Sequence, residues 1–150
     1  MALRDGLMAE IKEAMKAKAA DRLSALRLIL NGLKEREIAL RGEGTAMTEA
    51  DELTVLAKMV KQRQESVKVY LEGARQDLAD KESAEIRVIE EFLPKQLSPA
   101  EVEAAVVAAI AETGAASVKD MGRVMAVLKG KYTGQMDFGA VGALIKARLA

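Results

Sequence analysis

The sequence that decides the fold is residues 58–78, KMVKQRQESVKVYLEGARQDL. At about 100° per residue, apolar side chains in and just before this stretch line one face of a helix. Arg63 falls near the middle of that face, where a helix that only packs against a core would carry Leu or Met. Because an unpaired buried charge costs several kcal/mol, the guanidinium must reach a carboxylate, a carbonyl or a ligand. The apolar face consists of Leu56, Val60, Val67, Leu71 and Ala74.

Two interpretations of Arg63 follow. In the first, Arg63 forms an ion pair with a carboxylate of a neighbouring helix, and the candidate partners are Glu37, Asp77, Glu82 and Glu85. In the second, Arg63 contacts a ligand or a protein partner. The surface for that contact would comprise Lys58, Lys61, Arg63, Tyr70 and Arg75.

The composition indicates an all-α protein. Of 150 residues, 50% are hydrophobic and 31% are charged, which is typical of soluble globular proteins, and only 3% are aromatic. Strands favour aromatic and β-branched side chains, whereas Ala, Leu, Met, Glu and Lys, which are abundant here, favour helices. We expect an N-terminal domain of about four helices, arranged as a bundle or as hairpins, followed by a small three-helix domain.

Helix boundaries in the N-terminal part are predicted from capping residues. Apolar residues recur about one turn apart over residues 3–15, and Asp21 is expected to cap a second helix. After a glycine-bearing loop, Thr48 and Asp51 resemble a capping box that begins the helix of Arg63.

The third helix loses its regularity near Gly73, and Asp77 or Asp80 is expected to cap a fourth helix over about residues 78–92. Residues 90–101, EEFLPKQLSPAE, then mark the boundary between the two parts of the chain. One proline stops the fourth helix, and a serine, a second proline and a glutamate begin the next. We therefore expect two domains, residues 1–97 and 98–150.

Three short helices are predicted in the second domain, over about residues 99–113, 118–129 and 138–150. Ser117 with Asp120 would begin the second of them, and the following loop would hold Gly130 and Gly134. The segments MGRVM and VGALI place Gly122 and Gly142 at the edge of an apolar stripe, where a missing side chain permits close helix approach. Asp137 would begin the last helix.

The residue inventory excludes several kinds of site. The chain has no Cys and no His, so a disulfide, a thiolate nucleophile, an imidazole base and a Cys/His zinc site are excluded. No aspartate-rich loop of the calcium type is present. We expect no catalytic residue, no metal and no cofactor.

Charge and hydropathy limit the kinds of partner that we expect for this protein. Basic and acidic residues both number 23, so no net field draws the chain to nucleic acid, and we expect no DNA binding. The longest apolar run, residues 104–111, is far too short to span a bilayer, and residues 1–18 lack the apolar run of a secretory signal. We expect a cytoplasmic protein with no membrane partner.

Local basic groups leave a role for RNA open. Lys119, Arg123, Lys129 and Lys131 could contact phosphates, or they could form a solvated face with ordinary ion pairs. With so few aromatic residues, base stacking cannot be the main mode, so recognition would be of the backbone or of folded shape.

Several stretches, in this order, resemble the YqeY family. That family is similar, over its C-terminal portion, to the tail of GatB, the B subunit of tRNA-dependent amidotransferases. The stretches are LRLILNGLKEREI (26–38), KMVKQRQES (58–66), GARQDL (73–78), EEFLPKQLS (90–98) and MGRVM (121–125) with residues 134–137.

The resemblance implies an N-terminal helical domain typical of YqeY-like proteins and a three-helix module of the GatB-tail type. In the amidotransferase that module contacts tRNA, while the chemistry takes place on other domains. It implies that the RNA-binding positions here are Lys119, Arg123, Lys129 and Lys131. Residues 98–150 carry six basic and five acidic side chains, a net charge of only +1, which is low for a strong tRNA binder.

Three functions are therefore candidates. The first is a non-catalytic tRNA-associated module linked to amidotransferase systems, which are carbon–nitrogen ligases with glutamine as amide donor. The second is a protein-interaction adaptor that uses the surface of Arg63, Tyr70 and Arg75. The third is an amidotransferase component that is active only with other subunits, because glutamine hydrolysis needs an activated Cys, or a Ser with a Lys base, that the sequence does not indicate.

Overall fold

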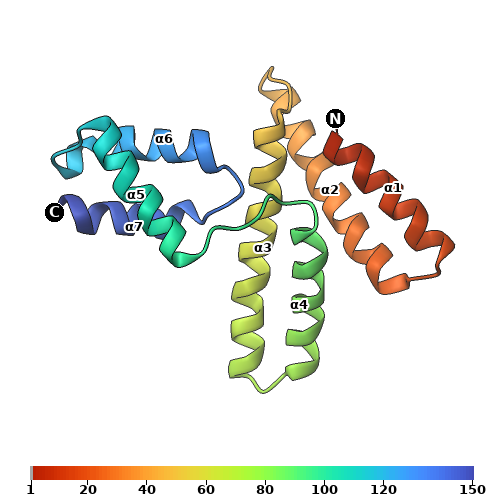
Figure 1. Ribbon diagram of the computed structural model, residues 1–150. Coiled ribbons are helices and arrows are strands. Elements are labelled where there is room, and N and C mark those ends of the chain that lie inside the picture. Colours follow the sequence, from red (N-terminus) through yellow and green to blue (C-terminus); the bar gives the residue numbers. More distant parts are fainter. Residues whose placement is uncertain (1) are drawn as a thin grey trace. The chain divides into compact units, whose positions relative to one another are not determined.

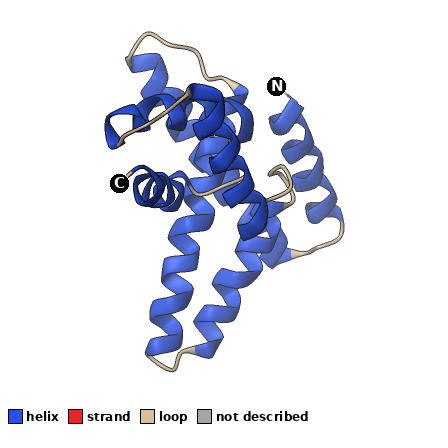
Figure 2. Ribbon diagram, turned by 60° about the vertical axis from the view of Figure 1, so that its left-hand side comes forward, coloured by secondary structure: helices blue, strands red, loops and turns tan. Residues whose placement is uncertain are grey.

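The computed structural model describes residues 2–150, and every regular element in that range is a helix (Figure 1). Figure 2 shows the same helices joined by short loops, and the all-α prediction is confirmed. The chain divides into two compact units, of which the first ends at Leu93 and the second spans Pro94–Ala150. Each unit has its own hydrophobic core. That residues 1–97 and 98–150 fold as separate domains stays a prediction.

Four α-helices make up the first unit: α1 (Ala2–Lys16), α2 (Ala20–Gly42), α3 (Glu49–Glu72) and α4 (Gln76–Glu90). Consecutive helices form two hairpins, α1 against α2 and α3 against α4 (Figure 1). Helix α2 also packs against both α3 and α4, which joins the two hairpins. No helix in the described part of the chain is long and apolar enough to cross a membrane.

The core of the first unit lies around α2 and not along the whole α3–α4 hairpin. Helices α1 and α2 each contribute three buried residues, but α3 and α4 contribute only Leu56 and Ile89. Towards the turn at Gly73 the hairpin extends beyond this core, and Val69 is 62% exposed there. Something other than the main core must therefore hold this half of the hairpin together. The core residues are Leu7, Ile11, Ala14, Leu26, Ile29, Leu33, Leu56 and Ile89.

The two predicted capping boxes are confirmed. At the start of α3, the Asp51 carboxylate accepts a 2.9 Å hydrogen bond from the Thr48 amide, and the Thr48 hydroxyl accepts one of 3.2 Å from the Asp51 amide. Ser98 and Glu101 make the same reciprocal pair at the start of α5 (Pro99–Thr113), at 3.0 and 3.2 Å. These bonds use amides that the first helical turn leaves unpaired, so sequence alone locates these two starts.

The predicted N-cap of α2 is wrong. The helix begins at Ala20 with Ala19 as its N-cap, and Asp21 lies inside the first turn. Lys18 adopts a left-handed conformation with φ 54°, and the chain enters the helix directly after it. In the first turn, the Asp21 carboxylate still interacts favourably with the partial positive charge of the helix N-terminus. Its side chain is exposed and remains available for other contacts.

The predicted N-cap of α4 is also wrong. The helix begins at Gln76 after Arg75, so neither Asp77 nor Asp80 is a cap. Gly73 does end α3, but the left-handed residue of the connection is Ala74, with φ 57°. The amide of Arg75 donates a 2.8 Å hydrogen bond to the carbonyl of Tyr70, which closes the turn. A non-glycine residue is strained in this conformation.

We predict that Ala74→Gly stabilises the protein by about 0.5–1 kcal/mol, because glycine adopts a positive φ without the steric cost that alanine meets. Urea unfolding of the full chain measures the change. The matched control is Ala84→Gly in the interior of α4, which should destabilise by about 1 kcal/mol. Equal losses in both variants would show that the conformation of Ala74 is not strained.

The second unit contains α5 (Pro99–Thr113), a 3₁₀ turn η1 (Val118–Asp120), α6 (Met121–Tyr132) and α7 (Phe138–Leu149). Asp137 caps α7 as predicted, and its carboxylate accepts a 2.9 Å hydrogen bond from the Gly139 amide. The core residues are Ala105, Val106, Ala109, Val124, Leu128, Met136, Val141 and Ile145.

Two predictions about α6 need correction. The helix proper begins at Met121, after η1, and it runs to Tyr132 and not to about residue 129. Gly130 therefore lies inside the helix, whereas Gly134, with φ 79°, lies in the loop as predicted. The apolar periodicity ends at Leu128, but backbone hydrogen bonding continues for one further turn. The low helix propensity of glycine is a weak signal, and here the hydrogen bonding of the helix overrides it.

The packing prediction holds for one of the two paired glycines. Gly142 is buried, and a Cβ there would lie 3.4 Å from the Met121 Cε and 3.5 Å from the Met125 Cε, so α7 approaches α6 closely at this point. Gly122 is exposed, and a Cβ there would meet nothing within 4 Å. Its missing side chain serves no helix contact, and the prediction that it is a packing notch is wrong.

Candidate functional site

Arg63 is held by carboxylates of the neighbouring helix. Its Nε donates a 3.0 Å hydrogen bond to Oε2 of Glu85, and Glu82 lies at 4.0 Å. Its Nη1 donates to the Met59 carbonyl at 3.3 Å. The side chains of Arg63 and Glu85 are only 15% and 16% exposed. The ion-pair interpretation of Arg63 is confirmed.

The other carboxylates considered for Arg63 have different partners. Glu37 pairs with Arg4 and, at 3.0 Å, with Arg41. Glu37 is therefore wrong as a partner of Arg63, because α2 meets α3 near Gly32, where Met59 approaches it, and not near Glu37. Asp77 is wrong for a simpler reason, since it pairs with Arg75 two residues before it.

We predict that breaking the pair from one side destabilises the protein more than removing it entirely. Arg63→Met leaves Glu85 three-quarters or more buried without its cation and should cost about 2–3 kcal/mol. The double variant Arg63→Met with Glu85→Leu should recover all but about 1 kcal/mol, since no buried charge is left. A double-mutant cycle in urea measures both values, and additive losses would mean that the two side chains do not interact.

The predicted partner surface is not one continuous patch. At about 100° per residue, Lys58 and Lys61 lie roughly 140° and 160° around α3 from Arg63. Lys58 and Lys61 are exposed, Tyr70 is half-buried, and Arg75 binds the Asp77 carboxylate at 3.0 and 3.1 Å. The pairing with Arg75 holds the pKa of Asp77 below its usual value. The structure therefore brings Tyr70 and Arg75 together near the hairpin turn, but not with the two lysines.

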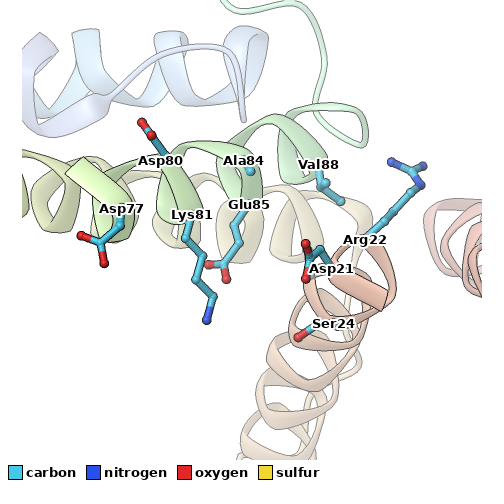
Figure 3. Close-up of a pocket in the computed structure, with 10 residues that line it drawn as sticks. Asp21, Arg22, Ser24, Asp77, Asp80, Lys81, Ala84, Glu85 and Val88 are labelled. Atoms are coloured by element: carbon cyan, nitrogen blue, oxygen red, sulfur yellow. The ribbon is translucent and has the colours of Figure 1, made fainter. Parts of the chain in front are cut away.

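A groove of about 580 Å³ separates the first half of α2 from α4 (Figure 3). Sequence analysis did not find it, because its two walls come from segments more than fifty residues apart. Helix α2 contributes Asp21, Arg22, Ser24 and Ala25. Helix α4 contributes Asp77, Asp80, Lys81, Ala84, Glu85 and Val88. Figure 3 shows Asp77, Lys81 and Glu85 on the side of α4 that is turned towards Asp21 and Ser24.

Most charges around the groove are already compensated. Arg22 points away from it and binds Glu91 at 2.7 and 3.0 Å and Glu10 at 2.9 Å. These hydrogen bonds, that of Glu91 first, raise the pKa of Arg22. Asp80 accepts a 2.7 Å hydrogen bond from Gln76. Asp21 and Lys81 have no ion pair or side-chain hydrogen bond within the described residues.

The four predicted RNA-binding residues lie on or near the solvent side of α6. Arg123 binds Asp120 at 2.7 Å and the Thr113 carbonyl at 3.2 Å, and Lys131 binds Glu112 at 2.8 Å. Backbone amides, that of Ala116 first, and Arg123 lower the pKa of Asp120 to about 2, so the carboxylate stays ionised.

Lys119 and Lys129 are exposed, and neither forms an ion pair within residues 2–150. The ordinary ion pairs of a solvated face are present at Arg123 and Lys131, and a phosphate contact at these four positions stays a prediction.

Small residues lie between these basic groups on α6. Gly122, Ala126 and Gly130 are spaced four apart in α6, so they form one stripe along the helix, and all three are exposed. A Cβ at either glycine would meet no atom within 4 Å. A ligand backbone could therefore approach the helix closely along this stripe.

Glu52 is the charged residue that sequence analysis missed. It is completely buried, and neither of its carboxylate oxygens has a hydrogen-bond partner within residues 2–150. The Nε of Arg4 is also buried and has no partner in that range. Burial raises the pKa of Glu52, although the Arg4 charge opposes the shift. A signal was present, because Glu52 lies one turn before Leu56 and thus on the core face of α3.

We predict that Glu52→Gln stabilises the protein, and more so as the pH rises. The pKa of Glu52 is raised on folding, so the native carboxyl loses stability as the pH rises above about 4.5, the ordinary value, and then through the folded-state pKa. The variant should be about 1–2 kcal/mol more stable at pH 8 and nearly equal at pH 4. Urea unfolding between these values tests it, with exposed Glu49→Gln as the control; a difference that is constant with pH would contradict it.

Comparison with known proteins identifies the family of this chain. A family model described as Yqey-like protein matches residues 4–149. The chain belongs to the YqeY-like family. Curated relatives of this YqeY-like protein carry the name altered inheritance of mitochondria protein 41, mitochondrial. The one from Clavispora lusitaniae is 38% identical over 92 residues, which are 61% of this chain and 52% of that protein.

Two further relatives have the same name. The protein of Vanderwaltozyma polyspora is 33% identical over 103 residues, 65% of this chain and 53% of its own length. That of Saccharomyces cerevisiae is 33% identical over 90 residues, 58% of this chain and 46% of its own length. The matched part is thus about half of the length of these relatives. Their names contradict the expectation of a cytoplasmic protein, because they describe mitochondrial proteins.

Proposed function

We propose that this YqeY-like protein is a non-catalytic module that associates with tRNA, in connection with glutamine-dependent amidotransferase systems that act as carbon–nitrogen ligases. The tRNA would be bound by its phosphate backbone on the solvent side of α6. The link to amidotransferases, and the similarity of the second unit to the GatB tail, come from the family resemblance and belong to the proposal.

The residue inventory supports a binding role over a catalytic one. The sequence contains no Cys and no His, and so it lacks the commonest nucleophile and the commonest base for acyl transfer. Among the described residues no cluster of acidic side chains could hold a metal ion. A component that is active only with other subunits would obtain its chemistry from them.

The single observation that carries the RNA proposal is the composition of the exposed face of α6. Lys119, Arg123, Lys129 and Lys131 surround the stripe of Gly122, Ala126 and Gly130. Phosphate contacts require cations, and close approach of a sugar–phosphate backbone requires small side chains between them.

Two of the four cations are in exposed ion pairs. Both side chains of the Lys131–Glu112 pair are more than half exposed, and so is Arg123, although its partner Asp120 is only 26% exposed. Exposed pairs contribute little to stability, so both cations can exchange their partner for a phosphate. The Glu112 partner raises the pKa of Lys131, which therefore stays charged. We infer that Lys119 and Lys129 make the first phosphate contacts and that the paired cations add to them.

A partner surface centred on Arg63 is not part of this proposal. The guanidinium Nε is bound to Glu85 and the Nη1 to the Met59 carbonyl, and the side chain is only 15% exposed, so little of it can reach a partner. A second candidate function, that of a protein-interaction adaptor, is supported instead by the groove between α2 and α4.

We predict a salt-dependent affinity for tRNA, measured by fluorescence anisotropy with labelled tRNA and the full chain. Each phosphate contact adds a little under one unit to the slope of log affinity against log salt, so four cations would give a slope of about −3. Lys119→Glu with Lys129→Glu should weaken binding and reduce the slope by about 2. Binding weaker than about 10⁻⁴ M, or independent of salt, would overturn the proposal.

Two further variants separate this face from charge in general. Gly130→Leu leaves every charge in place but fills the stripe of small residues, so affinity should fall while the salt slope changes little. Lys146 lies on α7 of the same unit, outside this face, so Lys146→Glu should have less effect than Lys119→Glu or Lys129→Glu made singly. Equal effects from all three lysine reversals would indicate attraction by net charge alone.

A further inference from the structure

The groove between α2 and α4 is lined by carboxylates of which some oxygens form no bond to a described residue. On the α2 wall, the exposed Asp21 carboxylate has no ion pair or side-chain hydrogen bond within residues 2–150. On the α4 wall, Glu85 accepts the Arg63 Nε only through Oε2, at 3.0 Å. Its Oε1 has no hydrogen bond to a described residue, and the Glu85 side chain lines the groove. Acceptors therefore stand on both walls.

Among the described residues that line the groove, Lys81 is the cation that faces these acceptors. Lys81 lies one turn after Asp77 and one turn before Glu85 on α4, and it is exposed without an ion pair among the described residues. Asp77 is already bound to Arg75, and Arg22 points out of the groove to Glu10 and Glu91. The side chains that line the groove comprise four carboxylates and two cations, a net charge of −2 over the lining, although Arg63 and Arg75 behind it pair with Glu85 and Asp77.

The floor of the groove is apolar and shallow because its side chains are small. Ala25 is buried, Ala84 is exposed, and Val88 is half-buried between them and the core. A surface of methyl groups next to carboxylates is complementary to a side chain with an alkyl stem and a cationic head. The volume of about 580 Å³ is sufficient for several side chains of a docked segment.

We propose that this groove is a docking site for a basic segment of a protein partner, with a lysine stem lying on Ala25, Ala84 and Val88 and its ammonium group between Asp21 and Glu85. Charge complementarity selects the partner: a segment with lysines on one face satisfies both walls. The structural pair of Arg63 and Glu85 then has a second role, because Arg63 holds Oε2 and thereby turns Oε1 to the ligand.

Lys81 is the internal competitor for this site. Its ammonium group can approach the same carboxylates when the groove is empty, and an incoming lysine must displace it. Its removal should therefore strengthen binding, which is the opposite of what loss of an ordinary contact residue would cause. An increase in affinity when Lys81 is removed would distinguish a specific binding site from a generally acidic surface.

The experiment uses the full chain and two fluorescein-labelled, alanine-rich helical peptides of about 15 residues. One peptide carries lysines spaced four apart, and the other carries glutamines at the same positions. Anisotropy measures affinity, and amide chemical shifts in ¹⁵N-labelled protein locate the site. We expect the lysine peptide to bind about tenfold more tightly than the glutamine peptide at low salt and to shift the amides of Asp21, Ser24 and Ala84.

Variants of the protein then test each part of the proposal. Asp21→Asn should weaken binding about tenfold, and the matched control Asp5→Asn, an exposed aspartate in the first turn of α1, should leave it unchanged. Lys81→Met should tighten binding about threefold. Ala84→Leu, which changes no charge, should weaken binding at least fivefold. Circular dichroism melting confirms that each variant is folded.

Several outcomes would overturn the proposal. These are equal binding of the two peptides, equal effects of Asp21→Asn and Asp5→Asn, or amide shifts that lie outside the groove. Spermidine that produces the same shifts at the same concentration as the peptide would assign the groove to small cations, and not to a protein segment. None of these variants touches α6, so tRNA binding can fail while peptide binding succeeds, and the reverse.

Discussion

The pair of Arg63 and Glu85 is the interaction on which the first unit depends. The main core secures α1 and α2 but reaches the α3–α4 hairpin only through Leu56 and Ile89. Beyond that point the hairpin has few buried apolar side chains, and a charge pair at 3.0 Å joins its two helices instead. Such a pair adds little net free energy compared with packed apolar residues, but it allows only one register, because a shifted helix would leave both charges unpaired.

The same arrangement shapes the groove. Along part of this hairpin a groove separates α2 from α4, and it is lined by charged side chains together with Ser24, Ala25, Ala84 and Val88 (Figure 3). One carboxylate oxygen of Glu85 serves the fold, and in the proposed complex the other binds the ligand. The structural role of Glu85 and its proposed binding role thus share one side chain. The two roles are separable because they use different carboxylate oxygens.

The second unit uses glycine in two different ways. Gly142 is buried and lets α7 approach Met121 and Met125, whereas Gly122 and Gly130 are exposed and leave the outer face of α6 bare. In the sequence the buried and the exposed glycines look alike, because each interrupts the pattern of an amphipathic helix. Only the neighbouring helix decides which glycine meets another side chain, because burial is a property of the packed unit.

The sequence by itself determined the helical class, the capping boxes at Thr48 and Ser98 and the need of Arg63 for a partner, because these follow from local hydrogen bonding and from the cost of an unpaired charge. It misplaced the starts of α2 and α4, where the backbone turns at Lys18 and Ala74 without a capping side chain. Only the tertiary structure decided that Glu85 and not Glu37 neutralises Arg63, that Glu52 is buried, and that Asp21 faces α4. Each of these depends on which helices become neighbours, and that is settled by the packing of distant apolar residues and not by the residues adjacent in the chain.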